Sequence, residues 1–231
     1  MDFDCIFING DSYSEPVSRY KTYGVFLSEQ LGIPVTNLAK AGSSNKRIVR
    51  STIENLIKLK TEFSNPLVII GWSFVRRREV WYYGDDPQVD DYVFDTPLSR
   101  LVTLDFLLKN NLATPDQKAS IPPALQIHKA LTDFYTDLYL LSNYLRMNNI
   151  RYFWFSGADN TDCPIHSFPY LESLAQVKAV NTDPNIFALH DFCMLKWAQQ
   201  NDHKAAPTGH LSQQGHQKFS KFLLDKLSLD V

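Results

Sequence analysis

Two residue types that acyl transfer requires occur in suitable surroundings in this sequence. Ser12 follows a short apolar run and Gly10-Asp11, and His210 lies in a polar segment just before the last helix-like stretch. A serine at the carboxyl end of a strand becomes a nucleophile when a histidine accepts its proton. The sequence therefore predicts that Ser12 attacks a carbonyl carbon, with His210 as the general base.

Attack on a carbonyl also requires donors for the oxygen that becomes negatively charged. The backbone N–H groups of Ser12 and Gly42 are the main candidates, because both residues lie in polar turns of small residues after expected strands. The side chains of Asn45 and Ser73 are further candidates for this oxyanion hole. We therefore expect the two backbone amides to hold the oxygen, with help from one of these side chains.

Three residues at the same expected strand ends are predicted to contact the substrate, namely Asp11, Trp72 and Arg76. Arg76 begins a run of arginines, which either forms a solvated surface or binds a carboxylate or phosphate of the substrate. Trp72 suits a core position and a cleft wall equally well.

The other histidines and the cysteines are expected to be structural. His216 is predicted to pack at the start of a helix rather than to catalyse. The spacing of His203, His210 and His216 matches no zinc-binding pattern, so we expect no metal, and nothing indicates another cofactor. Cys163 and Cys193 have no base near them in the sequence.

The composition of the 231-residue chain is typical of a soluble globular protein. Hydrophobic residues make up 44% and charged residues 21%, which argues against disorder. The formal net charge of −2 gives no basic field for a nucleic acid, and no apolar run is long enough to span a membrane. The first residues lack a signal-peptide pattern, and three scattered cysteines suit a reducing compartment. We therefore expect a cytoplasmic protein that binds neither a nucleic acid nor a membrane.

Short apolar runs alternate with helical periodicities along the chain. Strands are expected at residues 3–9, 35–39, 67–70, 152–155 and 186–189, and helices at 17–31, 45–60, 124–147 and 213–227. This alternation predicts an α/β fold with a mostly parallel sheet that helices cover on both faces. Residues 1–231 are expected to form one domain, with a cap-like insertion around 74–123 that contains a helix at 98–108. Ligands of such sheets bind at the carboxyl ends of the strands, where the candidate residues lie.

Four motifs that occur in this order make the chain resemble the SGNH (GDSL-like) hydrolase family. They are Gly10-Asp11-Ser12, Asn37-Leu38-Ala39-Lys40-Ala41-Gly42, Gly71, and Gly209-His210-Leu211-Ser212 with Gly215-His216. The resemblance implies a three-layer α/β/α, flavodoxin-like sandwich with about five parallel strands. It also implies that Ser12 is the nucleophile and that Gly42 donates to the oxyanion hole. The implied activity is hydrolysis of a small-molecule or glycan ester, without a cofactor.

Two positions depart from the pattern of this family. Ser73 stands where the third motif of the family has an asparagine that completes the oxyanion hole. Pro207 stands where the last motif has the aspartate that orients the histidine. Asn45 is the candidate to replace the missing amide. Asp202, or a backbone carbonyl of the loop before His210, is the candidate to orient the imidazole.

These departures leave other functions open besides ester hydrolysis. A catalytically degenerate SGNH domain would bind a ligand, or serve as a virion or assembly component, without turnover. An acyltransferase would use the same serine with an acceptor other than water. Gly71-Trp72-Ser73 followed by arginines resembles divergent, phage-borne members of the family, which favours a virus-encoded protein. A nucleotide-binding flavodoxin-like domain is disfavoured because the chain has no Gly-x-Gly-x-x-Gly loop.

Overall fold

The structure is a computed structural model that describes residues 3–77, 79–82, 100–115, 123–160, 165, 168–187, 189, 192–201, 203 and 210–228. Much of the expected insertion lies outside these residues, as do four residues of the sequence analysis: Cys163, Asp202, Pro207 and Gly209.

Strands and helices alternate from the first strand to the third, and the last described strand is preceded and followed by helices. The strands are β1 (Cys5–Gly10), β2 (Val35–Asn37), β3 (Pro66–Trp72), β4 (Glu79–Tyr82), β5 (Arg100–Thr103) and β6 (Arg151–Ser156). The helices are α1 (Tyr23–Leu31), α2 (Asn45–Leu59), α4 (Leu104–Lys109), α6 (Pro123–Met147), α7 (Pro169–Ser173), α8 (Ala175–Asn181), α9 (Met194–Gln200) and α10 (Gln213–Leu227).

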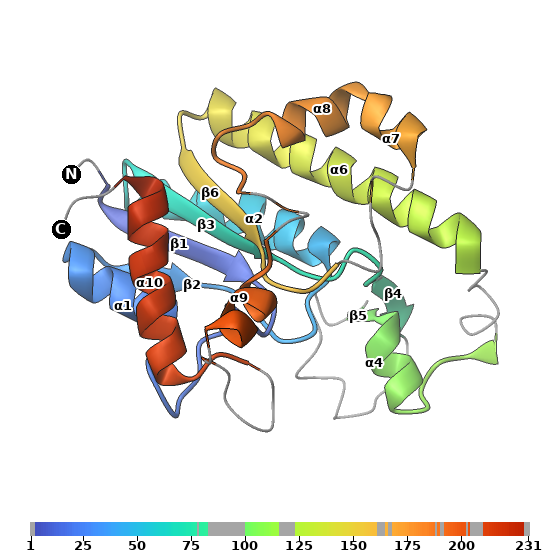
Figure 1. The fold of residues 1–231 in the computed structure, drawn as a ribbon, viewed down its shortest axis with the longest axis horizontal. Coiled ribbons are helices and arrows are strands. Elements are labelled where there is room, and N and C mark those ends of the chain that lie inside the picture. The colour runs from blue at the N-terminus through green and yellow to red at the C-terminus, as the bar shows by residue number, and fades with distance from the viewer. Residues whose placement is uncertain are drawn as a thin grey trace.

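The main sheet is parallel and has the strand order β2-β1-β3-β6 (Figure 1). Buried apolar residues run along β1 and β3 without polar alternation, which is the pattern of strands covered on both faces. Gly10 pairs with Gly71, and Trp72 pairs with Ser156, so three strands end at nearly the same level. The α/β fold with a parallel, helix-covered sheet is therefore confirmed.

The fifth strand that the sequence predicts at 186–189 is not formed as a strand. Ile186 makes an isolated parallel bridge to Trp154, and Cys193 makes another to Ser156. Just before the first of these contacts, the Asp183 carboxylate accepts a hydrogen bond from the N–H of Asn185 at 2.9 Å and holds a turn. The described parallel sheet therefore has four strands.

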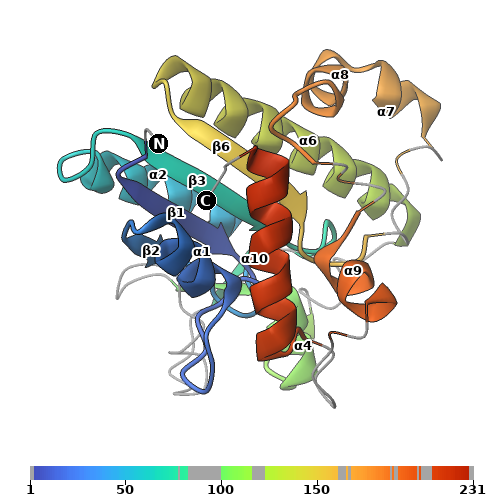
Figure 2. The same ribbon diagram turned by 60° about the vertical axis from the view of Figure 1, so that its left-hand side comes forward.

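Helices cover the two faces of the sheet, which gives the expected three layers (Figures 1 and 2). Side chains alternate along β1, so Ile6 and Ile8 pack toward α1 and α10, whereas Cys5 and Phe7 pack toward α2 and α6. In Figure 2, α10 crosses one face of the sheet, while α6 with α7 and α8 lies on the other side. Both faces are filled mainly by aliphatic and aromatic side chains.

Local signals explain most helix boundaries. Ser44 caps α2 by accepting a hydrogen bond from the N–H of Arg47 at 3.0 Å, and Ser212 caps α10 in the same way. Gly32 ends α1 in the left-handed conformation, with φ of 68°. The predicted start of this helix at residue 17 is wrong, because α1 begins at Tyr23 and the preceding residues form a loop.

Trp72 belongs to the core, so its predicted contact with the substrate is wrong. Its side chain is 0% exposed. The indole packs edge-on against Phe134 at 5.8 Å and against Trp154 at 5.2 Å between ring centroids. Side chains alternate across a strand, and this position of β3 points toward α6 rather than toward the sheet edge.

The predicted helix at 98–108 is only partly formed. β5 occupies Arg100–Thr103 and pairs antiparallel with β4, with Val80 opposite Val102. The helix α4 begins at Leu104 and ends at Lys109. Val102 and Thr103 are β-branched, which favours a strand when a partner strand is available.

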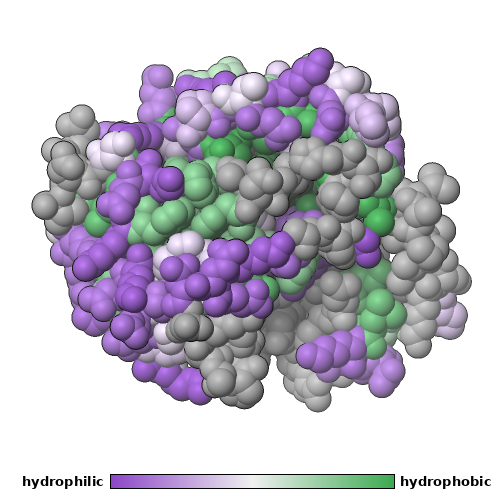
Figure 3. Space-filling view, in the orientation of Figure 1, coloured by the Kyte–Doolittle hydropathy of each residue, from purple (hydrophilic) through white to green (hydrophobic). Residues whose placement is uncertain are grey.

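Hydrophilic residues cover most of the described surface in Figure 3, and hydrophobic residues show as smaller patches between them. Within the described ranges, no helix combines the length and apolarity needed to cross a membrane.

Candidate active site

Ser12 and His210 meet at the carboxyl edge of the parallel sheet. Ser12 lies two residues after the end of β1, and His210 lies three residues before the start of α10. Nε2 of His210 is 3.0 Å from Oγ of Ser12, which is hydrogen-bonding distance. Both residues are partly exposed, so the pair is accessible to a ligand. The structure thus brings the predicted nucleophile and the predicted base together.

The two residues that follow His210 are held by hydrogen bonds. The N–H of Ser212 donates to the carbonyl of His203 at 2.7 Å, and the hydroxyl of Tyr20 donates to the carbonyl of Leu211 at 3.3 Å. Gly215 allows this close approach, because a Cβ there would lie 2.7 Å from the His203 carbonyl oxygen. The start of α10 therefore positions the imidazole.

His216 is buried behind this pair and packs against aromatic rings, as the sequence predicts. It is 3% exposed, and its ring lies 5.6 Å from Tyr20 and 6.1 Å from Tyr23. Burial, together with the nearby His210, lowers the pKa of His216 to about 4. The buried imidazole is therefore neutral near neutral pH.

The turn that presents Ser12 is built around Asp11. One carboxylate oxygen of Asp11 accepts a hydrogen bond from the N–H of Tyr13 at 3.1 Å, and its carbonyl accepts one from the N–H of Ser14 at 3.0 Å. The Asp11 side chain is 0% exposed. The predicted contact of Asp11 with the substrate is therefore wrong, because this side chain is buried and holds the turn in place.

Gly71 on β3 makes room for this turn. A Cβ at Gly71 would lie 2.5 Å from Oγ of Ser14, and one at Gly10 would lie 2.7 Å from the carbonyl oxygen of Gly71. The hydroxyl of Tyr23 donates to Oγ of Ser14 at 2.9 Å and holds this serine in place. The glycines of the first and third motifs thus let the turn after β1 pack directly on β3.

Two backbone N–H groups in the turns after β1 and β2 have no acceptor among the described residues. Gly42 adopts the left-handed conformation, with φ of 77°, which favours glycine. Ser43 closes the same turn, because its N–H and its hydroxyl both donate to the carbonyl of Lys40. Among described residues, the N–H groups of Ser12 and Gly42 have no hydrogen-bond acceptor. Both amides are therefore available for a ligand oxygen.

Asn45 is not available as an oxyanion donor, which corrects this expectation. Its amide nitrogen donates to the carbonyl of Ser73 at 3.3 Å, and its amide oxygen accepts from the N–H of Ser73 at 2.9 Å. Asn160 adds a further support, because its amide oxygen accepts from the N–H of Val75 at 2.8 Å. Both amides therefore hold the backbone that follows β3.

The Ser73 hydroxyl is likewise engaged, so this second expectation is also corrected. It is buried and donates to the carboxylate of Asp11 at 3.0 Å. It also accepts a hydrogen bond from Nη1 of Arg77 at 2.7 Å. Burial raises the pKa of Asp11, and the charge of Arg77 opposes that rise. Arg77, Ser73 and Asp11 thus form one buried polar network.

The arginine that faces this network is Arg77, a residue for which no role is predicted above. Its side chain is 15% exposed, whereas Arg76, the residue predicted to grip the substrate, is exposed. One signal was present in the sequence: a carboxylate buried at a sheet edge needs a cationic partner, and the arginine run lies next to Ser73.

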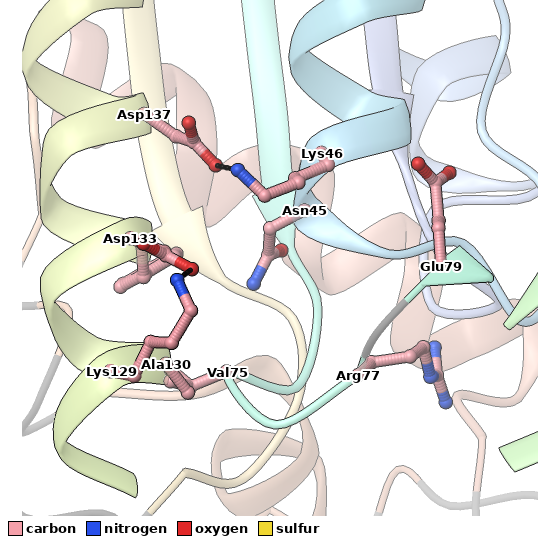
Figure 4. A pocket seen from close by; sticks show the side chains of 10 residues that line it. Asn45, Lys46, Val75, Arg77, Glu79, Lys129, Ala130, Asp133 and Asp137 are labelled. Atoms are coloured by element: carbon pink, nitrogen blue, oxygen red, sulfur yellow. Dashed lines mark hydrogen bonds and ion pairs between the residues drawn. The ribbon is translucent and has the colours of Figure 1, made fainter. Parts of the chain in front are cut away.

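A cavity of about 290 Å³ lies beside the network, between α2, α6 and the segment after β3 (Figure 4). Arg77 and Asn45 line it together with charged residues of both helices. Lys46 pairs with Asp137 at 3.3 Å, and Lys129 pairs with Asp133 at 2.8 Å. Arg77 thus lines this cavity and also contacts Asp11 in the turn that carries Ser12.

The group that orients His210 is not identified by the described residues, because Asp202 and the loop just before His210 lie outside them. Among described residues, no three His, Cys, Asp or Glu side chains gather as a metal site would require.

Solved structures with a similar fold are esterases and lipolytic proteins. The chain is similar to a protein assigned to the G-D-S-L family of lipolytic proteins from Desulfitobacterium hafniense DCB-2, with a TM-score of 0.53 at 11% identity over 96% of this chain and 99% of that one. TesA gives a TM-score of 0.51 at 13% identity, over 96% of this chain and 97% of that chain. The psychrotrophic esterase EstA from Pseudoalteromonas sp. gives 0.50 at 13% identity, over 97% of both chains. The chain therefore has the general fold of G-D-S-L-type esterases.

The sequence profile of a family described as "Family of unknown function (DUF6071)" matches residues 11–176. The chain belongs to this family. No curated protein sequence matches it.

Proposed function

We propose that this protein is a serine esterase that hydrolyses a small-molecule or glycan ester. The observation that carries the proposal is the 3.0 Å contact between Ser12 Oγ and His210 Nε2 at the carboxyl edge of the sheet. The two unused N–H groups of Ser12 and Gly42 support it, because acyl transfer needs donors for the carbonyl oxygen.

The proposed reaction proceeds in two halves. Nε2 of neutral His210 takes the hydroxyl proton of Ser12 while Oγ bonds to the ester carbon, and the N–H groups of Ser12 and Gly42 hold the oxyanion. The imidazolium then gives its proton to the leaving alcohol, which leaves an acyl-serine. Water, deprotonated by His210, attacks the acyl carbon and releases the acid and the free Ser12 hydroxyl.

Turnover is expected to be slow. The side chains of Asn45 and Ser73 bond to other groups, so the proposed oxyanion hole has two backbone donors and no side-chain amide. Loss of one oxyanion donor costs about 100- to 1000-fold in rate in a comparable enzyme. A slow esterase is therefore the expected behaviour, with His210 oriented by Asp202 or by a backbone carbonyl.

The cavity beside Arg77 suits the hydroxyl-rich part of such a substrate. Its charged lining consists of three cationic and three acidic residues: Lys46, Arg77, Lys129, Glu79, Asp133 and Asp137. A ligand with a net charge of either sign would be repelled by the three lining residues of the same sign. Sugar hydroxyls can donate to the carboxylates and accept from the cations, and Phe134 provides an apolar surface for the ring.

A variant of the cavity tests this part of the proposal. Asp137→Asn removes one carboxylate from the lining and leaves Ser12 and His210 in place. We expect KM for an acetylated sugar to rise about tenfold, the effect of roughly 1.4 kcal/mol of lost binding. KM for an aryl acetate, which has no hydroxyls, should not change. Equal effects on both esters would argue against a sugar in this cavity.

Covalent labelling tests the nucleophile directly. A fluorophosphonate should add once to the wild-type protein, as seen by intact mass, and should not add to Ser12→Ala. Ser18→Ala, which changes an exposed serine of the same loop, should be labelled like the wild type. If the folded wild type forms no adduct, the esterase proposal fails. The alternative function, a domain that binds a ligand or joins an assembly without turnover, would then be favoured.

A further inference from the structure

One guanidinium group connects the three loops that surround the proposed catalytic serine. Nη1 of Arg77 donates to Oγ of Ser73 at 2.7 Å and to the carbonyl oxygen of Ser43 at 3.1 Å. The same nitrogen lies 3.4 Å from Oδ2 of Asp11. The three partners follow the ends of β1, β2 and β3, which are neighbours in the sheet.

Two of the partners of Arg77 are next to residues with a proposed role in the reaction, and the third occupies a motif position. Asp11 directly precedes Ser12, and Ser43 directly follows Gly42. Ser73 occupies the position where the resemblance implies an asparagine. A movement of Arg77 would therefore shift the nucleophile and both proposed oxyanion donors together.

Arg77 is itself held in place. Its guanidinium carbon lies 5.1 Å from the centre of the Phe74 ring, a cation–π contact. The backbone of Ser73, four residues earlier, is bonded to the amides of Asn45 and Asn160. The side chain of Arg77 is 15% exposed, so the group is largely excluded from water. A fixed cation of this kind can define the positions of the loops that it contacts.

We propose that Arg77 is a positioning residue of the proposed active site. It sets the separation between the N–H groups of Ser12 and Gly42, and so compensates for the side-chain amide that is missing from the third motif. Arg77 acts on Ser12 and Gly42 through Asp11 and Ser43, and takes no part in the bonds that form and break. This inference rests on the proposed esterase function.

The test measures the rate at which a fluorophosphonate labels Ser12, because labelling does not require turnover. Arg77→Met should lower this rate about 100-fold, the size of effect seen when an oxyanion donor is lost. Arg77→Lys keeps the charge on a shorter side chain and should label at an intermediate rate. Arg146→Met, which changes an exposed arginine near the end of α6, is the control and should label like the wild type.

A second readout separates positioning from a general loss of structure. Millimolar guanidinium should restore labelling of Arg77→Ala at least tenfold, without a change in its melting temperature, and should not restore labelling of Ser12→Ala. An Arg77→Ala protein that guanidinium does not rescue overturns the proposal, since the binding site for the free ion would still be present.

The outcomes also distinguish this inference from the proposed function. A folded wild-type protein that is not labelled overturns the esterase proposal and this role with it. If the wild type is labelled and Arg77→Met is labelled at a rate within threefold of it, only the role of Arg77 is overturned. If Arg77→Met does not fold, Arg77→Lys decides: labelling at the wild-type rate overturns the role, and a rate at least tenfold lower supports it.

Discussion

The two sides of the carboxyl edge of the sheet are built in opposite ways. Toward α10, a single hydrogen bond joins Ser12 to His210, and both side chains are partly exposed. Toward α2 and α6, the polar groups of Asp11, Ser73 and Asn45 are buried and hydrogen-bonded to one another or to the backbone.

This difference between an accessible pair and a buried network is what the proposed active site would need, because a reactive pair requires a rigid support. Groups that take part in a reaction need unused bonding capacity, as the N–H of Ser12 has. Groups that only hold loops in place are more stable when their donors and acceptors are satisfied, as those of Asp11 and Ser73 are, although Nε of Arg77 is buried without a partner. The comparison therefore predicts that changes on the α10 side affect activity, whereas changes in the buried network affect stability first.

The largest effect is expected on the reactive side. His210→Ala removes the proposed base and should lower ester hydrolysis at least about 10,000-fold, as losses within catalytic units of this kind do. The melting temperature should change little, because His210 is partly exposed. His128→Ala, which alters a histidine of α6 stacked on Tyr170, serves as the control and should keep wild-type activity. Unchanged hydrolysis in His210→Ala would show that another group acts as the base.

The next effect is expected in the buried network. Asp11→Asn removes the negative charge and leaves the cation of Arg77 without its partner in a largely buried site. Breaking a buried ion pair in this way costs about 3–5 kcal/mol of unfolding free energy. Urea unfolding at pH 7 measures it. Glu29→Gln breaks the exposed pair with Lys21 and should cost less than about 1 kcal/mol.

A double variant sharpens the same comparison. Asp11→Asn combined with Arg77→Met removes both charges, so neither is left buried alone. The loss of stability should then be smaller than the sum of the two single losses by about 1–3 kcal/mol, since the residues are in contact. Strictly additive losses would mean that Asp11 and Arg77 do not stabilise each other.

A smaller effect concerns pH and His216, a buried residue of α10. Burial lowers the pKa of His216 to about 4, whereas an unfolded histidine has a pKa of about 6.5. Between these values the unfolded chain binds a proton that the folded protein does not. Stability therefore falls as the pH decreases from 6.5 to 4, by ~3 kcal/mol in total from this residue. His216→Phe should remove that part of the slope in urea unfolding at several pH values. An identical slope would assign the pH dependence to other groups.

The sequence predicts most of the elements and the proximity of Ser12 to His210, because both depend on local patterns. Apolar runs and serine caps define β1, β3, α2 and α10 within one or two residues. Ser12 follows β1 and His210 precedes α10, a helix that packs on the same sheet, and the two side chains meet at its carboxyl edge.

The support around the pair was not predictable in the same way. Arg77 is one of three adjacent arginines, and what distinguishes it from Arg76 is a set of contacts made by the fold, among them the one with Asp11, 66 positions away. The sequence makes Asn45 a candidate to replace the missing amide, but in the fold its side chain bonds to the backbone of Ser73. The strand expected at 186–189 does not form, because a strand also needs continuous pairing with β6, and the local sequence does not determine that pairing.

The smallest effect is expected for the group that orients His210. Asp202 is the nearest acidic residue before the histidine, and backbone carbonyls of the same loop are the competing acceptors. A backbone carbonyl can accept the Nδ1 proton without an acidic side chain, so we expect Asp202→Asn to keep the rate of hydrolysis within about threefold, far from the 10,000-fold loss seen when a triad aspartate is replaced. The comparison requires equal melting temperatures for the two proteins. A drop of a hundredfold or more would assign Asp202 as the orienting residue, and the reactive side would then depend on a carboxylate as the supporting side does.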